Sequence, residues 1–206
     1  ILYFKKDRRI NKSPLNYSGS KDVILPKILK ALPKHVGTFV DAMGGAFNVG
    51  ANIMALEKVV YNEYNPFVFD IIKMLYDNNP EALINKIEAI VKKFELSKKA
   101  KEEYIKLRHH YNGKEKTAIN LFVLQIYAFQ NMIRFNRKLE MNTPVGNNEY
   151  CKSIKDRLMN FAVRAPKIEF FKGSYEELNL NSFNSIKDQA SRFFLLPHCW
   201  IGRAMG

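Results

Sequence analysis

Cysteine is scarce in this chain, and the two that occur, Cys151 and Cys199, lack the spacing of metal ligands. So few cysteines argue against a disulfide framework and favour a reducing compartment. The sequence also lacks an apolar run long enough to span a bilayer, and residues 1–10 carry no secretory signal. Internal repeats and low-complexity linkers are absent as well. We therefore expect a globular protein of the cytoplasm, with no metal site.

Acidic residues are outnumbered: 33 Lys and Arg face 20 Asp and Glu, which gives a net charge of +13 and a pI of about 9.6. A surplus of this size favours a polyanionic partner, nucleic acid first. The alternative is a general bias toward Lys and Asn that only decorates the surface. With 206 residues, 47% of them hydrophobic, the chain is long enough for a substantial core.

Strand-like and helix-like segments alternate along the sequence, which predicts a parallel α/β sheet. The middle of the chain is helical and interrupts this sheet, with residues 133–150 expected as a loop. We divide the chain into a cofactor-binding part (1–76), a helical target-recognition region (77–165) and a return to the sheet (166–206). The expected strands are 38–41, 58–61, 167–171 and 192–196, and the expected helices are 23–32, 48–56, 67–76, 83–94, one capped by Ser97, 118–129 and 154–161.

A glycine-rich bend follows the first expected strand, which ends at Asp41. Gly44, Gly45 and Gly50 let the backbone approach a ligand closely and accept positive φ angles. The spacing differs from the dinucleotide G-x-G-x-x-G pattern, so the glycines alone are weak evidence. Glu63 strengthens it, because a carboxylate at the end of the second strand can accept both ribose hydroxyls. The alternative for Glu63 is a solvated acid in a turn.

Tyr17 and Lys21 lie four residues apart around a glycine in a short polar loop. An aromatic ring and an ammonium so placed can stack on one group and pair with a carboxylate. The alternative is an ordinary surface loop before a helix.

Several ordered motifs resemble the Dam-type, α-arrangement DNA adenine-N6 methyltransferases, over about residues 14–178. They are Asn-Tyr-Ser-Gly-Ser-Lys at 16–21, Phe-Val-Asp-Ala-Met-Gly-Gly at 39–45, Asn-Glu-Tyr-Asn at 62–65 and the loop at 133–146. The resemblance implies a Rossmann-like methyltransferase sheet and S-adenosyl-L-methionine as cofactor. It also implies the cofactor-binding residues: Tyr17 and Lys21 at the adenosine and methionine portions, Asp41, Gly44 and Gly45 in the methionine pocket, and Glu63 on the ribose.

The loop at 133–146 is similar to the family's recognition loop, which implies that Arg134, Asn136, Arg137 and Lys138 lie near double-stranded DNA. Side-chain chemistry agrees, because Arg and Lys contact phosphates or guanine edges and Asn suits adenine. Phe135 could act as a wedge or as an anchor of the loop. The alternative is a solvated basic loop.

The family's catalytic Asp-Pro-Pro-Tyr motif is absent from the chain; near its expected place the sequence reads Leu195-Leu196-Pro197-His198. The motif orients the weakly nucleophilic adenine amine and stacks on the flipped base. We therefore name no catalytic residue and expect the C-terminal part of the sheet to be incomplete. Three explanations compete: a fragment or frameshifted product, a degenerate relative, or one half of a split enzyme. The abrupt break favours the first.

The resemblance implies a site-specific DNA adenine methyltransferase of a bacterial restriction-modification system, with doubtful activity in this chain alone. A cognate restriction endonuclease is a further expected partner. Two alternatives remain: a DNA-binding relative that no longer uses the cofactor, and an RNA methyltransferase.

Overall fold

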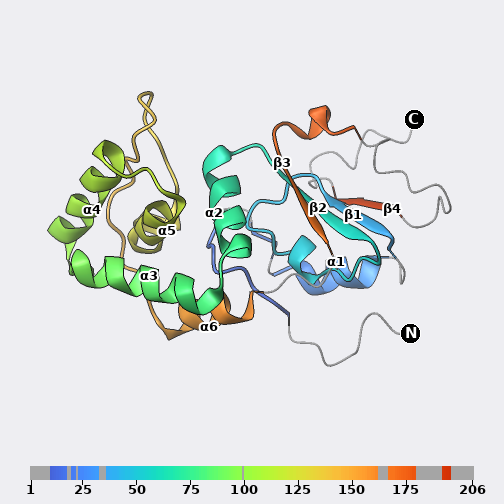
Figure 1. Cartoon of the computed structure of the whole chain (residues 1–206), viewed down its shortest axis with the longest axis horizontal. Helices are drawn as coiled ribbons and strands as arrows, with labels where there is room; N and C mark the ends of the chain where they lie inside the picture. Colours follow the sequence, from blue (N-terminus) through green and yellow to red (C-terminus); the bar gives the residue numbers. More distant parts are fainter. Residues whose placement is uncertain are drawn as a thin grey trace. The chain divides into compact units, whose positions relative to one another are not determined.

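The computed structural model describes residues 10–17, 20–21, 23–32, 36–98, 100–161, 167–179 and 192–195, the last of these by backbone alone. The chain divides into two compact units (Figure 1). The sheet unit comprises residues 1–12, 20–69 and 162–206, and the helical unit comprises 13–19 and 70–161. The functional division at residues 76/77 and 165/166 remains a prediction.

The sheet unit contains four parallel strands in the order β3-β2-β1-β4. They are β1 (Thr38–Asp41), β2 (Lys58–Glu63), β3 (Ile168–Lys172) and β4 (Arg192–Leu195). Asp41 at the end of β1 pairs in register with Tyr61 of β2. All four expected strands and their parallel arrangement are confirmed.

The order of the strands creates a switch point at β1. The chain passes from β1 to β2 and β3 on one side, and β4 then pairs with β1 on the other side. In open α/β sheets, ligands bind beyond the carboxyl ends of the strands where the order reverses in this way. The glycine-rich bend, residues 42–50, leaves β1 at this point.

Both central strands are buried except at Lys58, and each has consecutive apolar residues in its middle, as expected for a parallel strand covered on both faces. Helix α1 (Leu25–Ala31) precedes β1 and has Pro26 in its first turn, as expected. A cluster of apolar side chains covers one face of the strands; its members are Val40, Ala42, Val60 and Leu178, with Tyr175 packed against them.

The expected helix at 48–56 is wrong, because only a single 3₁₀ turn, η1 (Gly50–Asn52), forms there. Two local features prevent a longer helix. Phe47 has a φ of 60°, and the buried Asn52 side chain donates to the carbonyls of Asn48 and Asn11, at 2.7 Å each. Ile53 is then extended and leads toward β2. A side chain that bonds to nearby backbone competes with helix formation.

Helix α2 (Pro66–Asp77) runs from the sheet unit into the helical unit, with the boundary after Phe69. The helical unit continues with α3 (Pro80–Lys93), α4 (Lys101–Gly113), α5 (Ala118–Tyr127), η2 (Phe129–Asn131) and α6 (Lys152–Asn160). Asn79 caps α3 by accepting from Glu81 and Ala82. Ser97 is not the cap of α4, which begins at Lys101 after an uncapped Ala100.

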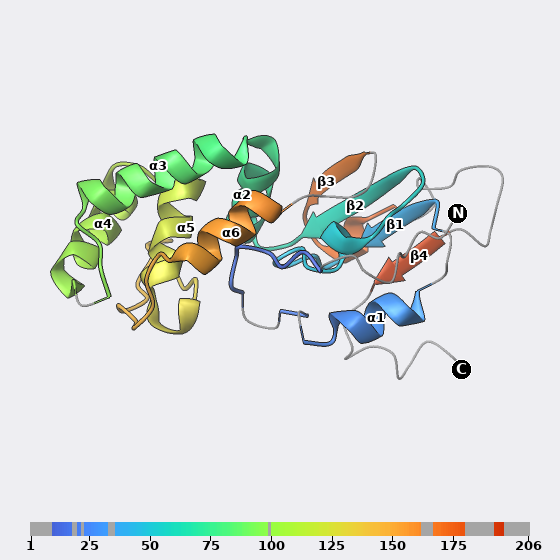
Figure 2. The same cartoon turned by 90° about the horizontal axis from the view of Figure 1, so that it is seen from below.

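Helix α5 forms the core of the helical unit, and α3 and α4 both pack against it (Figure 2). Its residues from Asn120 to Tyr127 are all buried, as its largely apolar sequence predicts. Helix α6 packs on α3. The buried residues of α3 and α4 are Leu83, Ile84, Ile87, Tyr104, Leu107 and Tyr111.

After β3, the capping-box spacing at Ser174 begins only a 3₁₀ turn, η3 (Tyr175–Glu177), in which Ser174 accepts from the amide of Glu176 at 3.3 Å. In the part of the chain that the structure describes, every helix is too short or too polar to cross a membrane.

Candidate functional site

The bend at residues 42–50 is fastened to the end of β2. The amide of Gly44 donates to the carbonyl of Asn62 at 2.8 Å, and the Asn62 amide group donates to Ala42 at 2.9 Å and Gly173 at 3.1 Å. Gly45 has a φ of 50°, which a side chain would disfavour. Hydrogen bonds within the protein thus fix the conformation of the bend at the switch point of the sheet.

Two of the glycines make room for the protein's own aromatic rings. A Cβ on Gly44 would lie 2.2 Å from the ring of Tyr61, and one on Gly50 would lie 2.1 Å from the ring of Phe47. These rings meet edge to face, with centroids 4.8 Å apart, and the Tyr61 hydroxyl donates to Gly45 at 2.8 Å. The pair of Phe47 and Tyr61 therefore packs against the glycines of the bend, a role that the sequence pattern did not indicate.

Glu63 joins the bend to the turn after β2. One carboxylate oxygen accepts from the amide of Gly45 and the other from the amide of Asn65, both at 2.8 Å. The side chain is buried, with 8% exposed. Two carboxylate oxygens offer about four lone-pair directions, so two remain for further donors such as ribose hydroxyls. The structure therefore makes Glu63 a fixed acceptor rather than a solvated acid.

Asp41, at the end of β1 where the bend begins, is an almost fully buried acid. Burial raises the pKa of Asp41 from its ordinary value of 3.8 to about 7. A hydrogen bond of 3.1 Å from the Gly50 amide lowers the pKa of Asp41. The negative charge of Glu63 raises this pKa, and the positive charge of Lys21 lowers it. Two carboxyl groups near one ammonium leave a site that favours an additional positive charge.

Lys21 and its neighbour Ser20 belong to the sheet unit. The hydroxyl of Ser20 accepts from the amide group of Asn48 at 2.8 Å, which fastens the segment to the bend. The positive charge of Lys21 lowers the pKa of Asp41, against the larger effect of burial. Of the predicted cofactor residues, the structure thus brings together Lys21, Asp41, Gly44, Gly45 and Glu63.

Tyr17 belongs to the helical unit, so its place beside the cofactor remains a prediction. Ser18 and Gly19, between Tyr17 and Lys21, lie outside the described residues. So does the region 196–206, with His198, Cys199 and Trp200. Cys151 is exposed and forms no disulfide.

The expected recognition loop, residues 133–146, forms an irregular hairpin in the helical unit and is drawn in yellow in Figure 1. Isolated antiparallel bridges join Ala128 to Val145 at its base and Phe135 to Met141 nearer its tip. Leu139 at the tip has a φ of 56° and is 59% exposed. We call residues 134–142 the recognition hairpin.

The four predicted DNA-binding residues differ in their hydrogen bonds and in their exposure. Asn136 accepts from the amides of Lys138 and Glu140, and its amide group donates to the Glu140 carboxylate at 2.8 Å. Arg134 donates to the side chain and carbonyl of Asn142. Both residues therefore hold the hairpin in shape. Arg137 and Lys138 are exposed at the tip, where their charges are available to phosphates.

Helix α4 holds the hairpin through side chains that we did not predict. Tyr104 and Arg108 both donate to the carbonyl of Thr143, at 2.9 and 3.1 Å. Asn112 exchanges two hydrogen bonds with the backbone of Met141. These donors are spaced by four residues and share one face of α4. That spacing was visible in the sequence, but the high charge of the helix obscured it.

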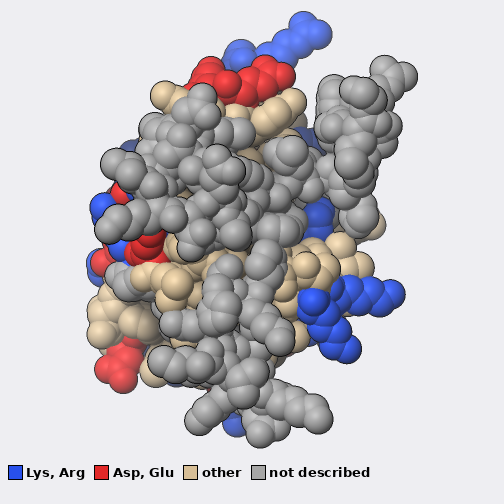
Figure 3. Space-filling view, turned by 90° about the vertical axis from the view of Figure 1, so that its right-hand side faces the viewer, with Lys and Arg blue, Asp and Glu red and all other residues tan. Residues whose placement is uncertain are grey.

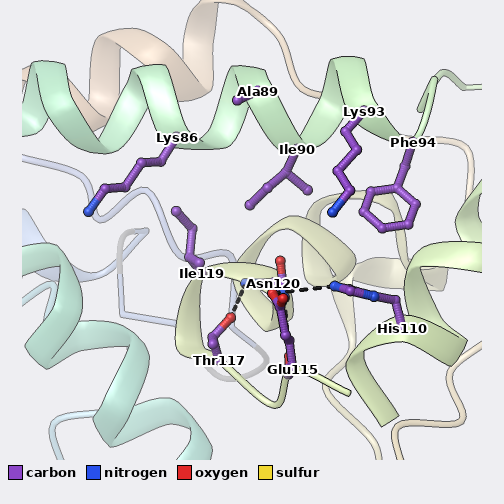
Figure 4. Close-up of a pocket in the computed structure, with 10 residues that line it drawn as sticks. All are labelled: Lys86, Ala89, Ile90, Lys93, Phe94, His110, Glu115, Thr117, Ile119 and Asn120. Atoms are coloured by element: carbon purple, nitrogen blue, oxygen red, sulfur yellow. Dashed lines mark hydrogen bonds and ion pairs between the residues drawn. The ribbon is translucent and has the colours of Figure 1, made fainter. Parts of the chain in front are cut away.

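A shallow hollow of about 280 Å³ opens between α3 and the start of α5 (Figure 4). His110 lies 3.3 Å from Glu115 at its rim, and this hydrogen bond lowers the pKa of the Glu115 carboxyl. Lys86 and Lys93 also line the hollow, which contains none of the predicted site residues. On the face drawn in Figure 3, the described basic and acidic side chains form small separate groups.

The fold and the site define a class: a parallel α/β domain with a glycine-rich bend at its switch point, followed in the chain by a helical unit whose hairpin carries exposed cations. Comparison with known proteins narrows this class. Residues 17–188 match the D12 class N6 adenine-specific DNA methyltransferases, and the chain belongs to this family.

Three curated relatives agree. The chain is 55% identical over 184 residues to modification methylase LlaI of Lactococcus lactis subsp. lactis, covering 89% of this chain. It is 30% identical to modification methylase StsI of Streptococcus sanguinis and 32% identical to type II methyltransferase M.FokI of Planomicrobium okeanokoites, with 84% of this chain covered in each case. The chain spans 30% of the LlaI methylase and 27% of each of the other two.

Proposed function

We propose that the bend of the sheet unit binds S-adenosyl-L-methionine. The observation that carries the proposal is the convergence of Glu63, Asp41 and Lys21 on a bend at the switch point. The residues fit the group, because Glu63 keeps acceptor capacity for ribose hydroxyls. The paired acids suit a sulfonium and an ammonium, while Lys21 suits the methionine carboxylate. When bound, the cofactor supplies a methyl group activated by its positive sulfur.

Each residue of the bend has a physical task in this proposal. Glu63 orients the ribose with an already fixed carboxylate, so little ordering remains to be done on binding. Asp41 neutralises positive charge inside a buried site, and cationic ligands favour its ionised form. Gly45 adopts the positive φ angle that the bend requires, and Gly44 leaves room for the ring of Tyr61 beside the bend.

We propose that the recognition hairpin contacts duplex DNA through Arg137 and Lys138, with Arg134 and Asn136 shaping it. The net charge of +13 and the exposed cations at the tip support this interaction. Asn136 can read an adenine edge only by giving up its hydrogen bonds within the turn. We therefore assign it first to hairpin geometry.

The whole protein's activity, in our proposal, is site-specific transfer of a methyl group to N6 of adenine in duplex DNA, in a restriction-modification system with a cognate endonuclease. The family and the names of the relatives support this assignment. A cytoplasmic location remains a prediction. The alternatives also remain: a DNA-binding relative without cofactor use, and an RNA methyltransferase.

Calorimetry with S-adenosyl-L-methionine tests the proposal directly. We expect wild type to bind, and Glu63→Gln or Lys21→Ala to weaken binding about tenfold or more while leaving DNA affinity nearly unchanged. Glu169→Gln is the matched control, because the same change is made on β3, where Glu169 pairs with Lys58 and Lys167. No cofactor binding by the folded wild type would reject the proposal in favour of a DNA-binding relative.

Competition between duplex DNA and structured RNA for the chain, at one stated salt concentration, distinguishes the hypothesis of a DNA methyltransferase from that of an RNA methyltransferase. Preference for the duplex supports the DNA assignment, and preference for RNA contradicts it.

A further inference from the structure

The tip of the recognition hairpin places Leu139 at a position that usually takes glycine. The amide of Asn136 donates to the carbonyl of Glu140 at 2.9 Å, and the amide of Leu139 donates to the carbonyl of Asn136 at 3.0 Å. These bonds close a three-residue loop, 137–139, of the kind in which the last residue adopts a left-handed conformation. Leu139 does so, with a φ of 56°. A leucine at this position strains the backbone, whereas a glycine would not.

Packing does not compensate for this strain, because the Leu139 side chain is 59% exposed. Phe47 is another bulky apolar residue with a positive φ, but it is 1% exposed and its ring meets the ring of Tyr61. Burial offsets the strain at Phe47, whereas Leu139 lacks comparable burial. Strained residues are concentrated at functional sites, where the surrounding structure enforces them. An exposed apolar side chain in a strained turn therefore indicates contact with a partner.

The loop is held in this conformation by side chains around it. The Asn136 side chain accepts from the amides of Lys138 and Glu140, at 2.9 and 3.0 Å. Its amide group also donates to the Glu140 carboxylate at 2.8 Å, which engages the acid next to the loop. Lys116, in the connection between α4 and α5, donates to the carbonyl of Leu139 itself at 3.3 Å. A fixed backbone thus presents the leucine to solvent, which reduces the ordering that binding would require.

The charges around Leu139 indicate what kind of partner fits. Arg137 and Lys138 precede it in the loop and are exposed, and the exposed Lys116 bonds to its carbonyl. Cations beside an apolar side chain match duplex DNA, whose phosphates attract the cations and whose bases offer apolar surface. Phe135 is less available for such a contact, because it is half-buried and lies in the paired part of the hairpin.

We propose that Leu139 is a base-contacting residue, whose side chain meets apolar base surface in duplex DNA while Arg137 and Lys138 contact phosphates. The inference rests on the proposed function, because it assigns a task to the tip of the same hairpin. Apolar base surface has two sources in a duplex. One is the methyl group of thymine in the major groove, and the other is the faces of two stacked bases between which an apolar side chain can insert.

Leu139→Gly tests the proposal, because it removes the side chain and relieves the strain at the same time. We expect an equal or higher melting temperature, and an affinity for a short mixed-sequence duplex that is about tenfold lower by fluorescence anisotropy. The salt dependence of binding should not change, because the phosphate contacts remain. A purely structural role for Leu139 predicts a lower melting temperature together with the loss of affinity. Leu139→Met, which keeps an apolar side chain, should retain most of the wild-type affinity.

Leu56→Gly is the matched control, because it makes the same change at another exposed leucine. Leu56 is 49% exposed and lies shortly before β2 in the sheet unit, without a positive φ. Glycine should therefore lower the melting temperature there and leave the DNA affinity at the wild-type value. Equal losses of affinity in the two glycine variants would overturn the proposal, because the effect would then belong to any exposed leucine.

Two modified duplexes identify which base surface is contacted. Replacement of every thymine by uracil removes the methyl groups, and it should weaken binding of wild type but not of Leu139→Gly if the side chain contacts thymine. A duplex that contains a fluorescent adenine analogue, brighter when unstacked, should brighten with wild type but not with Leu139→Gly if the side chain inserts between bases. Either result supports the proposal.

Leu139→Gly that binds the duplex as tightly as wild type overturns the inference and leaves the proposed function intact. Weaker binding by Leu139→Gly, with no response of wild type to either modified duplex, also overturns it. Wild type that binds no duplex rejects the proposed contact between the hairpin and DNA, and this inference with it.

Discussion

At the scale of single residues, Asp41 links the site to the stability of the fold. Its pKa of about 7 lies above the ordinary value of 3.8 because the carboxyl is buried. The folded chain therefore holds this proton more tightly than the unfolded chain does. The stability that this group contributes is fully present below pH 4 and is lost as the pH rises through 7.

Asp41→Asn should therefore raise the free energy of unfolding at high pH. The amide can keep the hydrogen bond from Gly50 without a buried charge. We expect little change at pH 4 and a gain of about 2–4 kcal/mol at pH 8, from the difference between the two pKa values. Urea denaturation across this pH range measures the gain, and cofactor affinity should fall in the same variant.

Asp77→Asn is the control for this pH trend, because Asp77 is an exposed acid paired with Lys73 on α2. Its effect on unfolding should be small and nearly independent of pH. A gain for Asp41→Asn that is equal at pH 4 and pH 8 would contradict the assignment of a buried, titrating acid.

Gly44→Ala should destabilise the sheet unit by about 1–3 kcal/mol, the usual effect of overpacking. The added methyl would meet the ring of Tyr61 at 2.2 Å. That ring is fully buried against Phe47 and Phe170, so it cannot move aside. Thermal melting measures the loss.

Gly113→Ala at the end of α4 makes the same chemical change in open space and should be neutral or slightly stabilising. Equal melting temperatures for the two alanine variants would show that the ring of Tyr61 does not limit the bend.

At the scale of elements, the recognition hairpin has separate parts for shape and for charge. Arg137→Ala with Lys138→Ala should reduce the salt dependence of DNA binding by about one unit of log–log slope per lost phosphate contact, with little change in melting temperature. Titrations of duplex DNA over a range of salt concentrations measure this slope.

Lys73→Ala with Lys106→Ala removes two charges from the same unit and serves as the control. Both lysines are exposed and engaged in local ion pairs on α2 and α4. If this pair of substitutions lowers the slope as much as the hairpin pair does, the binding comes from general charge and the hairpin assignment is wrong.

Periodicity predicted most elements, including all four strands and the buried helix α5. It failed at residues 48–56, where a positive φ at Phe47 and the bonds of Asn52 favour a single turn. It also missed the face of α4 that holds the hairpin. Both failures involve hydrogen bonds from side chains to the backbone, which leave only weak patterns in a sequence.

At the scale of the whole molecule, the sequence predicted a parallel sheet but could not give the strand order. The position of β4 beside β1 creates the switch point, and this depends on pairing across more than 150 residues of chain. The resemblance also placed Tyr17 and Lys21 in one motif, whereas the fold assigns them to different units. In the fold, Asp41 and Glu63 both accept hydrogen bonds from the glycine-rich bend, and the role of these two residues and Lys21 in cofactor binding stays a prediction.

The chain by itself should transfer little or no methyl group to DNA, because it contains no Asp-Pro-Pro-Tyr motif to orient the adenine amine. Incorporation of tritium from labelled cofactor into duplex DNA measures this activity. Incorporation clearly above that of a Lys21→Ala variant would contradict the prediction, and would show that other groups perform the missing role.

Asp41 also has a thermodynamic consequence for turnover. A carboxyl with a pKa of about 7 is partly protonated near neutrality. In the proposed function, a cationic nucleoside that binds beside this carboxyl expels a proton into the medium. When a neutral thioether nucleoside replaces the cation, a proton returns. The heat of binding of each nucleoside at pH 7 should therefore depend on the ionisation enthalpy of the buffer. Protons should be released when the cationic nucleoside binds and taken up when the neutral one replaces it.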